Sequence, residues 1–140
     1  SNRRHPRSLF CRLRQHENRQ MSGSFEDTWE TYAAAWKAET AAEKQALFER
    51  CLDPSCVYTD PLQQTRGWAA LIDYMLDFHQ QIPGGHFVTR YFLAHHDVSI
   101  ARWEMRGGDG SPLGDGISYG VYNPQGLLVG MTGFFEPTPG

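Results

Sequence analysis

The chain has 140 residues, of which 40% are hydrophobic and 13% aromatic, and a formal net charge of −3. Its length suits one domain with a real core, and it has neither an apolar run of about eighteen residues nor an apolar stretch behind its N-terminal arginines, which argues against a membrane span and a secretory signal. The three cysteines (Cys11, Cys51 and Cys56) lack CxxC spacing, which indicates free thiols in a reducing, cytoplasmic setting.

Residues 1–20 form a basic arm. Six arginines and one glutamate give the arm a net charge of +5, whereas residues 21–140 carry −8. Such an arm can bind nucleic acid or an anionic membrane surface, but the acidic body argues against both. Ser1-Asn2 resembles a remnant of tag removal, and Met21-Ser22-Gly23 reads like a natural start. We therefore expect a non-native extension over residues 1–20 and a single domain over residues 21–140.

Two helices are predicted next. From Phe25 onward, apolar residues recur at spacings of three and four and form one helix stripe: Phe25, Trp29, Tyr32, Ala33 and Trp36. A second helix is predicted from Ala41 to Leu52, because Asp53-Pro54 cannot continue a helix. Its expected buried face consists of Ala46, Leu47, Arg50 and Cys51.

The middle of the chain predicts a strand, a loop and a third helix. Residues 56–59 form a short strand that Asp60-Pro61 stops, and residues 62–67 form a loop. The third helix runs from Trp68 to about Gln81, where Pro83-Gly84-Gly85 follows. One side of this helix carries Leu71, Ile72, Met75, Phe78 and His79.

The remainder predicts four strands, over residues 86–94, 98–106, 114–122 and 127–135. Their short, turn-like connections indicate an antiparallel meander. Glycines inside the strands favour strong bending or the close approach of a ligand; they are Gly116, Gly120, Gly130 and Gly133. Helices before such a meander indicate an α+β fold.

This order resembles the nuclear transport factor 2-like superfamily. The resemblance rests on the strand that ends in Tyr58-Thr59-Asp60-Pro61, the helix after Gly67 and the final Gly133-Phe134-Phe135, and it covers Phe25 to Glu136. The SnoaL-like polyketide cyclase branch and ketosteroid isomerase are the most similar. The resemblance implies a cone-shaped, curved antiparallel sheet wrapped around three N-terminal helices, with an enclosed pocket. Its members include isomerases, dehydratases, cyclases, epoxide hydrolases and non-catalytic proteins, so the fold does not select a reaction.

The resemblance implies three catalytic candidates. Asp60 matches the general base of ketosteroid isomerase, although an Asp before Pro is also a common turn former. Tyr32 matches a tyrosine that donates a hydrogen bond to a developing enolate oxygen, with core packing as the alternative. His96 would be the acid or base of a dehydratase or cyclase, or else a turn histidine in solvent. His95 and His96 are adjacent, so they point apart and do not indicate a metal pair.

Ser118 departs from ketosteroid isomerase, and a set around Arg102 is similar to another branch. Ser118 stands where ketosteroid isomerase keeps a protonated carboxylic acid as its second oxyanion donor, and Asp115 is predicted on the opposite strand face. A serine donates a weaker hydrogen bond, which argues against steroid isomerisation by the full mechanism. Arg102 with Asp60 and Asp115 is similar to the acid–arginine–acid set of epoxide hydrolases, but Arg102 turns away if Trp103 faces the cavity.

The expected ligand-binding walls are apolar side chains together with Ser118. They are Trp36, Tyr58, Tyr74, Met75, Phe78, Trp103, Met131 and Phe135, although core packing would require the same residue types. These residues predict a pocket for a small apolar molecule. A cofactor-independent lyase, isomerase or cyclase that uses Asp60 is one hypothesis, and a non-catalytic binding or dimerisation module is the other.

No cofactor and no metal are expected, because no glycine-rich phosphate loop joins a strand to a helix and no ligand spacing is present. A homodimer through the outer sheet face is expected. Val98 and Ile100 alternate with Trp103 and Met105, so both faces of that strand are apolar and both need a cover.

Overall fold

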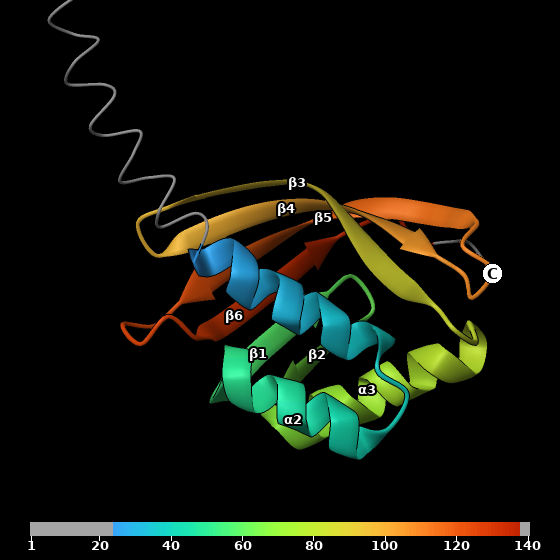
Figure 1. The fold of residues 1–140 in the computed structure, drawn as a ribbon, viewed down its shortest axis with the longest axis horizontal. Coiled ribbons are helices and arrows are strands. Elements are labelled where there is room, and N and C mark those ends of the chain that lie inside the picture. Colours follow the sequence, from blue (N-terminus) through green and yellow to red (C-terminus); the bar gives the residue numbers. More distant parts are fainter. Residues whose placement is uncertain (1–23, 138–140) are drawn as a thin grey trace, which may run out of the picture.

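The computed structural model describes residues 24–137, which form three helices and six strands (Figure 1). The first helix spans residues 24–37 and is called the aromatic helix below. The other elements are α2 (Ala41–Cys51), β1 (Leu52–Asp60), β2 (Gln63–Arg66), α3 (Trp68–Gln81), β3 (His86–His95), β4 (Val98–Arg106), β5 (Pro112–Tyr122) and β6 (Leu128–Phe134). The predicted arm over residues 1–20 lies outside the described residues.

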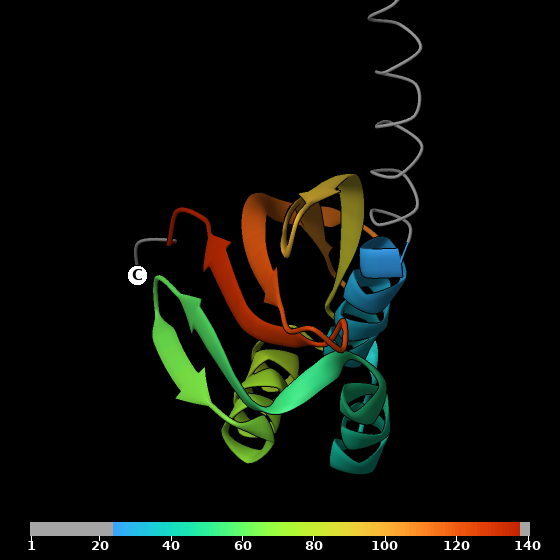
Figure 2. The same ribbon diagram turned by 90° about the vertical axis from the view of Figure 1, so that its left-hand side faces the viewer.

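The strands form one curved sheet in the order β2-β1-β6-β5-β4-β3. From β3 to β6 each strand pairs antiparallel with the next strand along the chain, which confirms the predicted meander. β1 joins parallel to β6 and β2 joins antiparallel to β1, so the sheet is mixed and its two edges stay unpaired with each other. The helices cover the concave side (Figures 1 and 2). This is the expected α+β fold with a cone-type sheet.

β2 corrects one expectation, because residues 62–67 were predicted as a loop. Gln63–Arg66 instead pairs with the end of β1, in a register that places Thr65 opposite Tyr58. The segment carries no apolar alternation, which is typical of a short polar edge strand and hides it from pattern reading. Inside β1 the pairing shifts between Leu52 and Val57, where Pro54 has no N–H to donate.

The aromatic helix contributes its predicted stripe to the core. Trp29, Tyr32 and Trp36 are all buried. Trp36 lies at the centre of a ring cluster, with centroid distances of 5.7 Å to Tyr58, 5.5 Å to Phe78 and 5.3 Å to Phe87. The three partners come from β1, α3 and β3, so one side chain joins the helices to two distant strands.

α2 begins where the sequence predicts. The Thr40 side chain accepts from the Glu43 amide and the Glu43 carboxylate accepts from the Thr40 amide, which is a complete capping box. Its buried face is different from the predicted one: Lys44, Phe48 and Cys51 are buried, whereas Ala46 and Arg50 are exposed. A lysine is rarely buried unless it is paired, so apolar periodicity does not indicate that Lys44 belongs to this face.

Lys44 is the hub of the three helices. Its Nζ lies 2.8 Å from the Ala35 carbonyl oxygen, 2.7 Å from that of Ala38 and 2.8 Å from Nε2 of His79 on α3. Ala35 lies in the last turn of the aromatic helix and Ala38 follows directly after it, where carbonyls have no donor within the helix. Burial lowers the pKa of Lys44 from 10.5 to about 8, with Glu43 opposing the shift.

The convex face of the sheet is apolar and uncovered within the described chain. Register aligns Tyr91, Arg102, Ile117 and Phe134 in one cross-strand row, and Leu93, Ile100, Tyr119 and Thr132 in the next. Tyr91, Leu93, Ile100, Ile117, Tyr119 and Phe134 are all exposed large side chains, and Phe134 reaches 58%. We call the eight residues of these two rows the outer face.

Candidate functional site

The site begins at Asp60, the last residue of β1. Its Oδ1 accepts hydrogen bonds from the backbone amides of Leu62 at 2.8 Å and Gln63 at 3.0 Å. These bonds close the Pro61-Leu62 turn into β2, as expected for an Asp before Pro. The turn thereby fixes the orientation of the carboxylate.

The second oxygen of Asp60 has different partners. Its Oδ2 accepts from the hydroxyl of Tyr58 at 2.6 Å and from the hydroxyl of Tyr74 at 2.8 Å. Tyr58 lies two residues earlier on β1 and therefore on the same strand face, whereas Tyr74 reaches in from α3. Four donors occupy the four lone-pair directions of the carboxylate. A substrate therefore cannot approach Asp60 unless a partner moves or relays the proton.

The tyrosines of the site remain protonated. Burial raises the pKa of Tyr58 far above its ordinary value, and the nearby Tyr32 and Asp60 raise it further. Burial and then the hydrogen bond to Asp60 raise the pKa of Tyr74 in the same way. Burial also raises the pKa of Tyr32, and a hydrogen bond from Trp36 offsets only part of this. All three hydroxyls are therefore hydrogen-bond donors at physiological pH.

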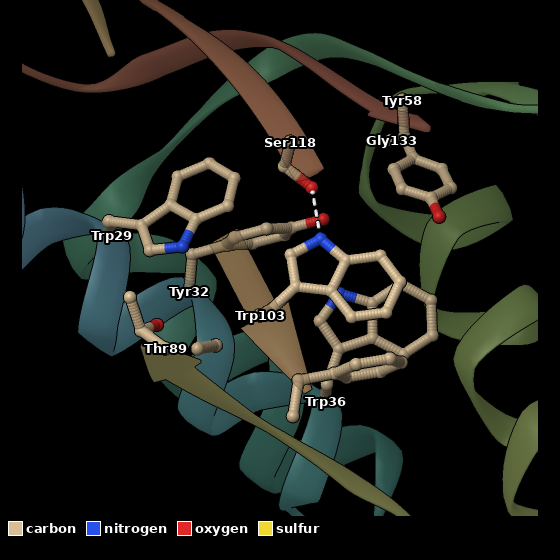
Figure 3. Close-up of a pocket in the computed structure, with 10 residues that line it drawn as sticks. Trp29, Tyr32, Trp36, Tyr58, Thr89, Trp103, Ser118 and Gly133 are labelled. Carbon is tan, nitrogen blue, oxygen red and sulfur yellow. Dashed lines mark hydrogen bonds between the residues drawn. The ribbon is translucent and has the colours of Figure 1, made fainter. Parts of the chain in front are cut away.

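A cavity of about 40 Å³ lies inside the cone (Figure 3). Tyr32 and Trp36 enter it from the aromatic helix, Tyr58 from β1, and Trp103 and Ser118 from β4 and β5. These five were predicted site residues, and the structure brings them together. The remaining lining residues are Trp29, Ala33, Phe87, Thr89 and Gly133.

Gly133 provides the open space beside Asp60. A Cβ atom at Gly133 would lie 3.7 Å from the Asp60 Cβ, 3.7 Å from the Ser118 Oγ and 3.9 Å from the Tyr58 hydroxyl oxygen. Three polar side chains from the two strands β1 and β5 thus surround one position on β6 that has no side chain. A bound polar atom would meet both hydroxyl groups there.

The other predicted wall residues lie behind or beside the cavity. Met75 and Met131 are fully buried core residues. Tyr74 and Phe78 contact Trp36 edge-on, with centroid distances of 6.2 Å and 5.5 Å. Phe135 packs against Trp103 at 6.1 Å. These five residues support the lining and do not form it.

The structure does not bring His96 to this cavity. His96 lies in the exposed β3–β4 turn with a φ of 52°, and its Nδ1 is 3.1 Å from that of His95. The alternative interpretation, a turn histidine in solvent, describes this position. The acid–arginine–acid set does not form either, because Arg102 and Asp115 are exposed on the convex side.

Four lining residues were not predicted to lie at the cavity: Trp29, Ala33, Phe87 and Thr89. Trp29 and Ala33 belong to the predicted helix stripe, so helix periodicity could have indicated that they face the cavity. Phe87 and Thr89 alternate on β3, but the register shift between Thr89 and Tyr91 changes which side chains face inward after that point. No local pattern in the sequence indicates this shift.

Two further features bear on cofactors and membranes. Within residues 24–137, no cluster of three or more His, Cys, Asp or Glu side chains has the geometry of a metal site. In the same part of the chain, no helix is long and apolar enough to cross a membrane.

Comparison with known proteins gives one family match. The model of the SnoaL-like domain matches residues 29–129. Comparison with curated proteins gives no match.

Solved structures with the same fold include a candidate isomerase of the SnoaL-like family from Agrobacterium tumefaciens, with a TM-score of 0.75 and 23% identity over 82% of this chain and 99% of that one. A candidate polyketide cyclase from Sinorhizobium meliloti has a TM-score of 0.62 and 17% identity, covering 76% of this chain and 93% of its own. A candidate SnoaL-like polyketide cyclase from Jannaschia has a TM-score of 0.67 and 12% identity, with coverages of 83% and 88%.

Proposed function

Because the chain belongs to the SnoaL-like domain family, we propose that it binds a small, largely apolar carbonyl compound in the cone and moves a proton on it without a cofactor. The reaction class is an isomerisation, cyclisation or dehydration with Asp60 as the general base. The observation that carries the proposal is the carboxylate that two tyrosines hold beside an aromatic cavity. The isomerase and cyclase names of the similar structures support the same class.

The proton travels through Tyr58. The Tyr58 oxygen lies nearer the open space at Gly133 than either carboxylate oxygen of Asp60, and it donates to Oδ2 of that carboxylate. As the C–H bond beside the substrate carbonyl breaks, its proton passes to the Tyr58 oxygen, while the proton of Tyr58 moves to Oδ2 of Asp60. The electron pair of the C–H bond forms an enolate. Reversal of the relay returns the proton, to the same carbon or to another.

The enolate oxygen needs donors. Tyr32 and Ser118 both line the cavity, the Tyr32 hydroxyl keeps its proton, and it points toward Ser118 (Figure 3). Donors fixed before the reaction stabilise charge that develops in a dry site by several kcal/mol, about 3 for one donor. Ser118 is the weaker of the two, so the site favours substrates that form their enolate more readily than a steroid ketone.

Non-catalytic binding is the second candidate. It is favoured by the saturation of Asp60, since four hydrogen bonds hold the carboxylate without any ligand. In that case Asp60 positions Tyr58 in the wall and Tyr74 behind it, and the cavity holds a ligand without turnover.

A second copy of the chain is the proposed protein partner. The outer face presents six exposed apolar side chains on a regular sheet surface, and the helices cover only the other side (Figure 1). We also propose a cytoplasmic location, which suits the free thiols of Cys51 and Cys56. Nucleic acid and membranes are not among the proposed partners.

Hydrogen exchange tests the proposed chemistry without the natural substrate. Cyclopentanone in deuterium oxide, followed by proton NMR, reports how fast its α hydrogens are replaced. We expect the protein to accelerate the exchange and Asp60→Asn to abolish the acceleration. Asp53→Asn is the matched control, because Asp53 is also a β1 carboxylate that accepts from a backbone amide and a hydroxyl, away from the cavity. Binding of the ketone without any exchange would instead support the second candidate.

A further inference from the structure

Trp103 forms the wall that limits the cavity. Its indole sits at the cavity lining but is only half-buried, unlike Trp36 and Tyr32 in the core. Its ring neighbours are Phe87 at 5.0 Å and Phe135 at 6.1 Å, both of which are half-buried too. The indole can therefore leave its place without opening the main core.

The indole occupies a space that a missing side chain provides. Trp103 and Gly116 are direct cross-strand partners. A Cβ atom at Gly116 would lie 2.4 Å and 2.5 Å from two carbons of the indole, and real Cβ atoms do not come so close. Gly116 is therefore the residue that allows the indole to lie flat against β5 and extend across the cone.

Trp103 also occupies the polar end of the cavity. Its Nε1 donates to the Oγ of Ser118 at 2.9 Å, shown as the dashed line in Figure 3. The space that remains, about 40 Å³, suits a group of a few atoms, since sites for drug-sized ligands measure about 300–1,000 Å³.

We propose that Trp103 is a plug that sets the size of the ligand. With the indole bound to Ser118, the cone admits only a compact carbonyl compound of a few non-hydrogen atoms, and it rejects fused-ring substrates. Without the indole, a flat ring takes its place between Phe87 and Phe135, and a hydroxyl group of that ring bonds to Ser118. This inference deepens the proposed function by naming its substrate class; it rests on the same pocket but not on proton transfer.

The test uses 2-naphthol, a flat two-ring probe with one hydroxyl group and no carbonyl. Isothermal titration calorimetry compares the wild type with Trp103→Ala. We expect the variant to bind at least about tenfold more tightly, because the ring then buries apolar surface that the plug otherwise covers. Trp68→Ala is the matched control: Trp68 is also half-buried and its Nε1 donates to the Asp53 carbonyl, but it lies outside the cavity. The affinity of Trp68→Ala for 2-naphthol should equal that of the wild type.

Two more variants complete the design. In the Trp103→Ala background, Ser118→Ala should remove about fivefold of the gained affinity, because the probe hydroxyl loses its partner. If Trp103→Ala does not fold by circular dichroism, Trp103→Phe keeps a ring but frees Ser118, and a smaller gain is expected. A folded Trp103 variant that binds the probe no better than the wild type overturns the proposal. Since the probe has no exchangeable α hydrogen, this result is independent of the ketone exchange that tests Asp60.

Discussion

At the scale of single residues, Asp60 combines two roles that looked like alternatives in the sequence. One carboxylate oxygen closes a turn and the other accepts from two tyrosines, so turn formation orients the site. Strand alternation alone places Tyr58 and Asp60 on one face. The pair therefore needs no long-range contact, whereas Tyr74 depends on the packing of α3 against β1.

The two tyrosines are not equivalent if the proton travels through Tyr58. We expect Tyr58→Phe to abolish ketone exchange, because the relay loses its hydroxyl. Tyr74→Phe should keep or increase the exchange rate, since it removes one donor from Oδ2 of Asp60 and leaves Tyr58 in place. Exchange rates of the two variants, measured by proton NMR, check this. Equal losses in both variants would show that the hydroxyl groups act only by holding the carboxylate.

The sequence identified individual site residues better than their contacts. Asp60 follows from its place at a strand end and Trp36 from helix periodicity, whereas the site roles of Tyr32 and Ser118 were implied by the resemblance to ketosteroid isomerase. The bond from Trp103 to Ser118 joins two strands whose register no local pattern sets, so it could not be predicted. His96 failed to reach the cavity because a turn at the far end of a hairpin carries its side chain into solvent.

At the scale of elements, Lys44 and His79 hold the helices together. A protonated Lys44 donates to the Ala35 and Ala38 carbonyls and to a neutral His79. A neutral Lys44 can instead accept from Nε2–H of His79. In either arrangement one hydrogen lies between Lys44 Nζ and His79 Nε2, and every polar group has a partner. If both side chains were protonated, the N–H groups of the two cations would point at each other. Burial and the charge of Lys44 accordingly lower the pKa of His79, against the opposing effects of the Ala38 backbone and Glu39.

The stability contributed by Lys44 should rise with pH. Its pKa falls from 10.5 in the unfolded chain to about 8 in the folded one, so between these values only the unfolded chain binds the proton, and raising the pH favours folding. We expect the difference in unfolding free energy between the wild type and Lys44→Met to grow by up to about 1.4 kcal/mol per pH unit from pH 8 to 10. Urea denaturation at several pH values measures it. A difference that stays flat would contradict the buried-lysine account.

His79 also makes the stability of the folded chain rise with pH, in this case at acidic pH. Its lowered pKa means that the unfolded chain binds a proton that the folded chain does not, so stability falls as the pH drops below about 6.5.

The contact between Lys44 and His79 was not predicted, because a lysine inside an apolar stripe is usually a solvent-facing position. The start of α2, the bounds of α3 and the strands of the meander were predicted closely, since caps, prolines and glycine turns mark them in the chain. β1 is an exception, because it begins at Leu52 and runs through Pro54, whereas a strand was predicted only over residues 56–59.

At the scale of the whole molecule, the sheet has two apolar faces and the described chain covers one. Alternation along β4 predicted two apolar faces, and the register places Ile100, Ile117 and Phe134 together on the convex side. The cavity volume was beyond prediction, because it depends on how far rings from several elements interpenetrate. The predicted site residues include five of the ten residues that line the cavity, but the sequence does not give the space between them.

The outer face should mediate dimerisation. We expect a dimer at micromolar concentration by size-exclusion chromatography with light scattering, and a monomer for Ile117→Lys with Phe134→Lys, because these cross-strand neighbours would bring two charges onto an apolar surface. Gln45→Lys with Gln80→Lys adds the same charge at exposed helix positions and should leave the dimer intact. If the wild type elutes and scatters as a monomer, the proposed dimer through the outer face is wrong.

The role of Asp60 as the base is tested by measuring the ketone exchange of the wild type and of Asp60→Asn side by side. We expect exchange above the buffer rate for the wild type, a decrease of at least about 100-fold for Asp60→Asn, and a change of less than about twofold for Asp53→Asn. An Asp60→Asn protein that exchanges the α hydrogens as fast as the wild type would contradict the assignment of Asp60 as the base.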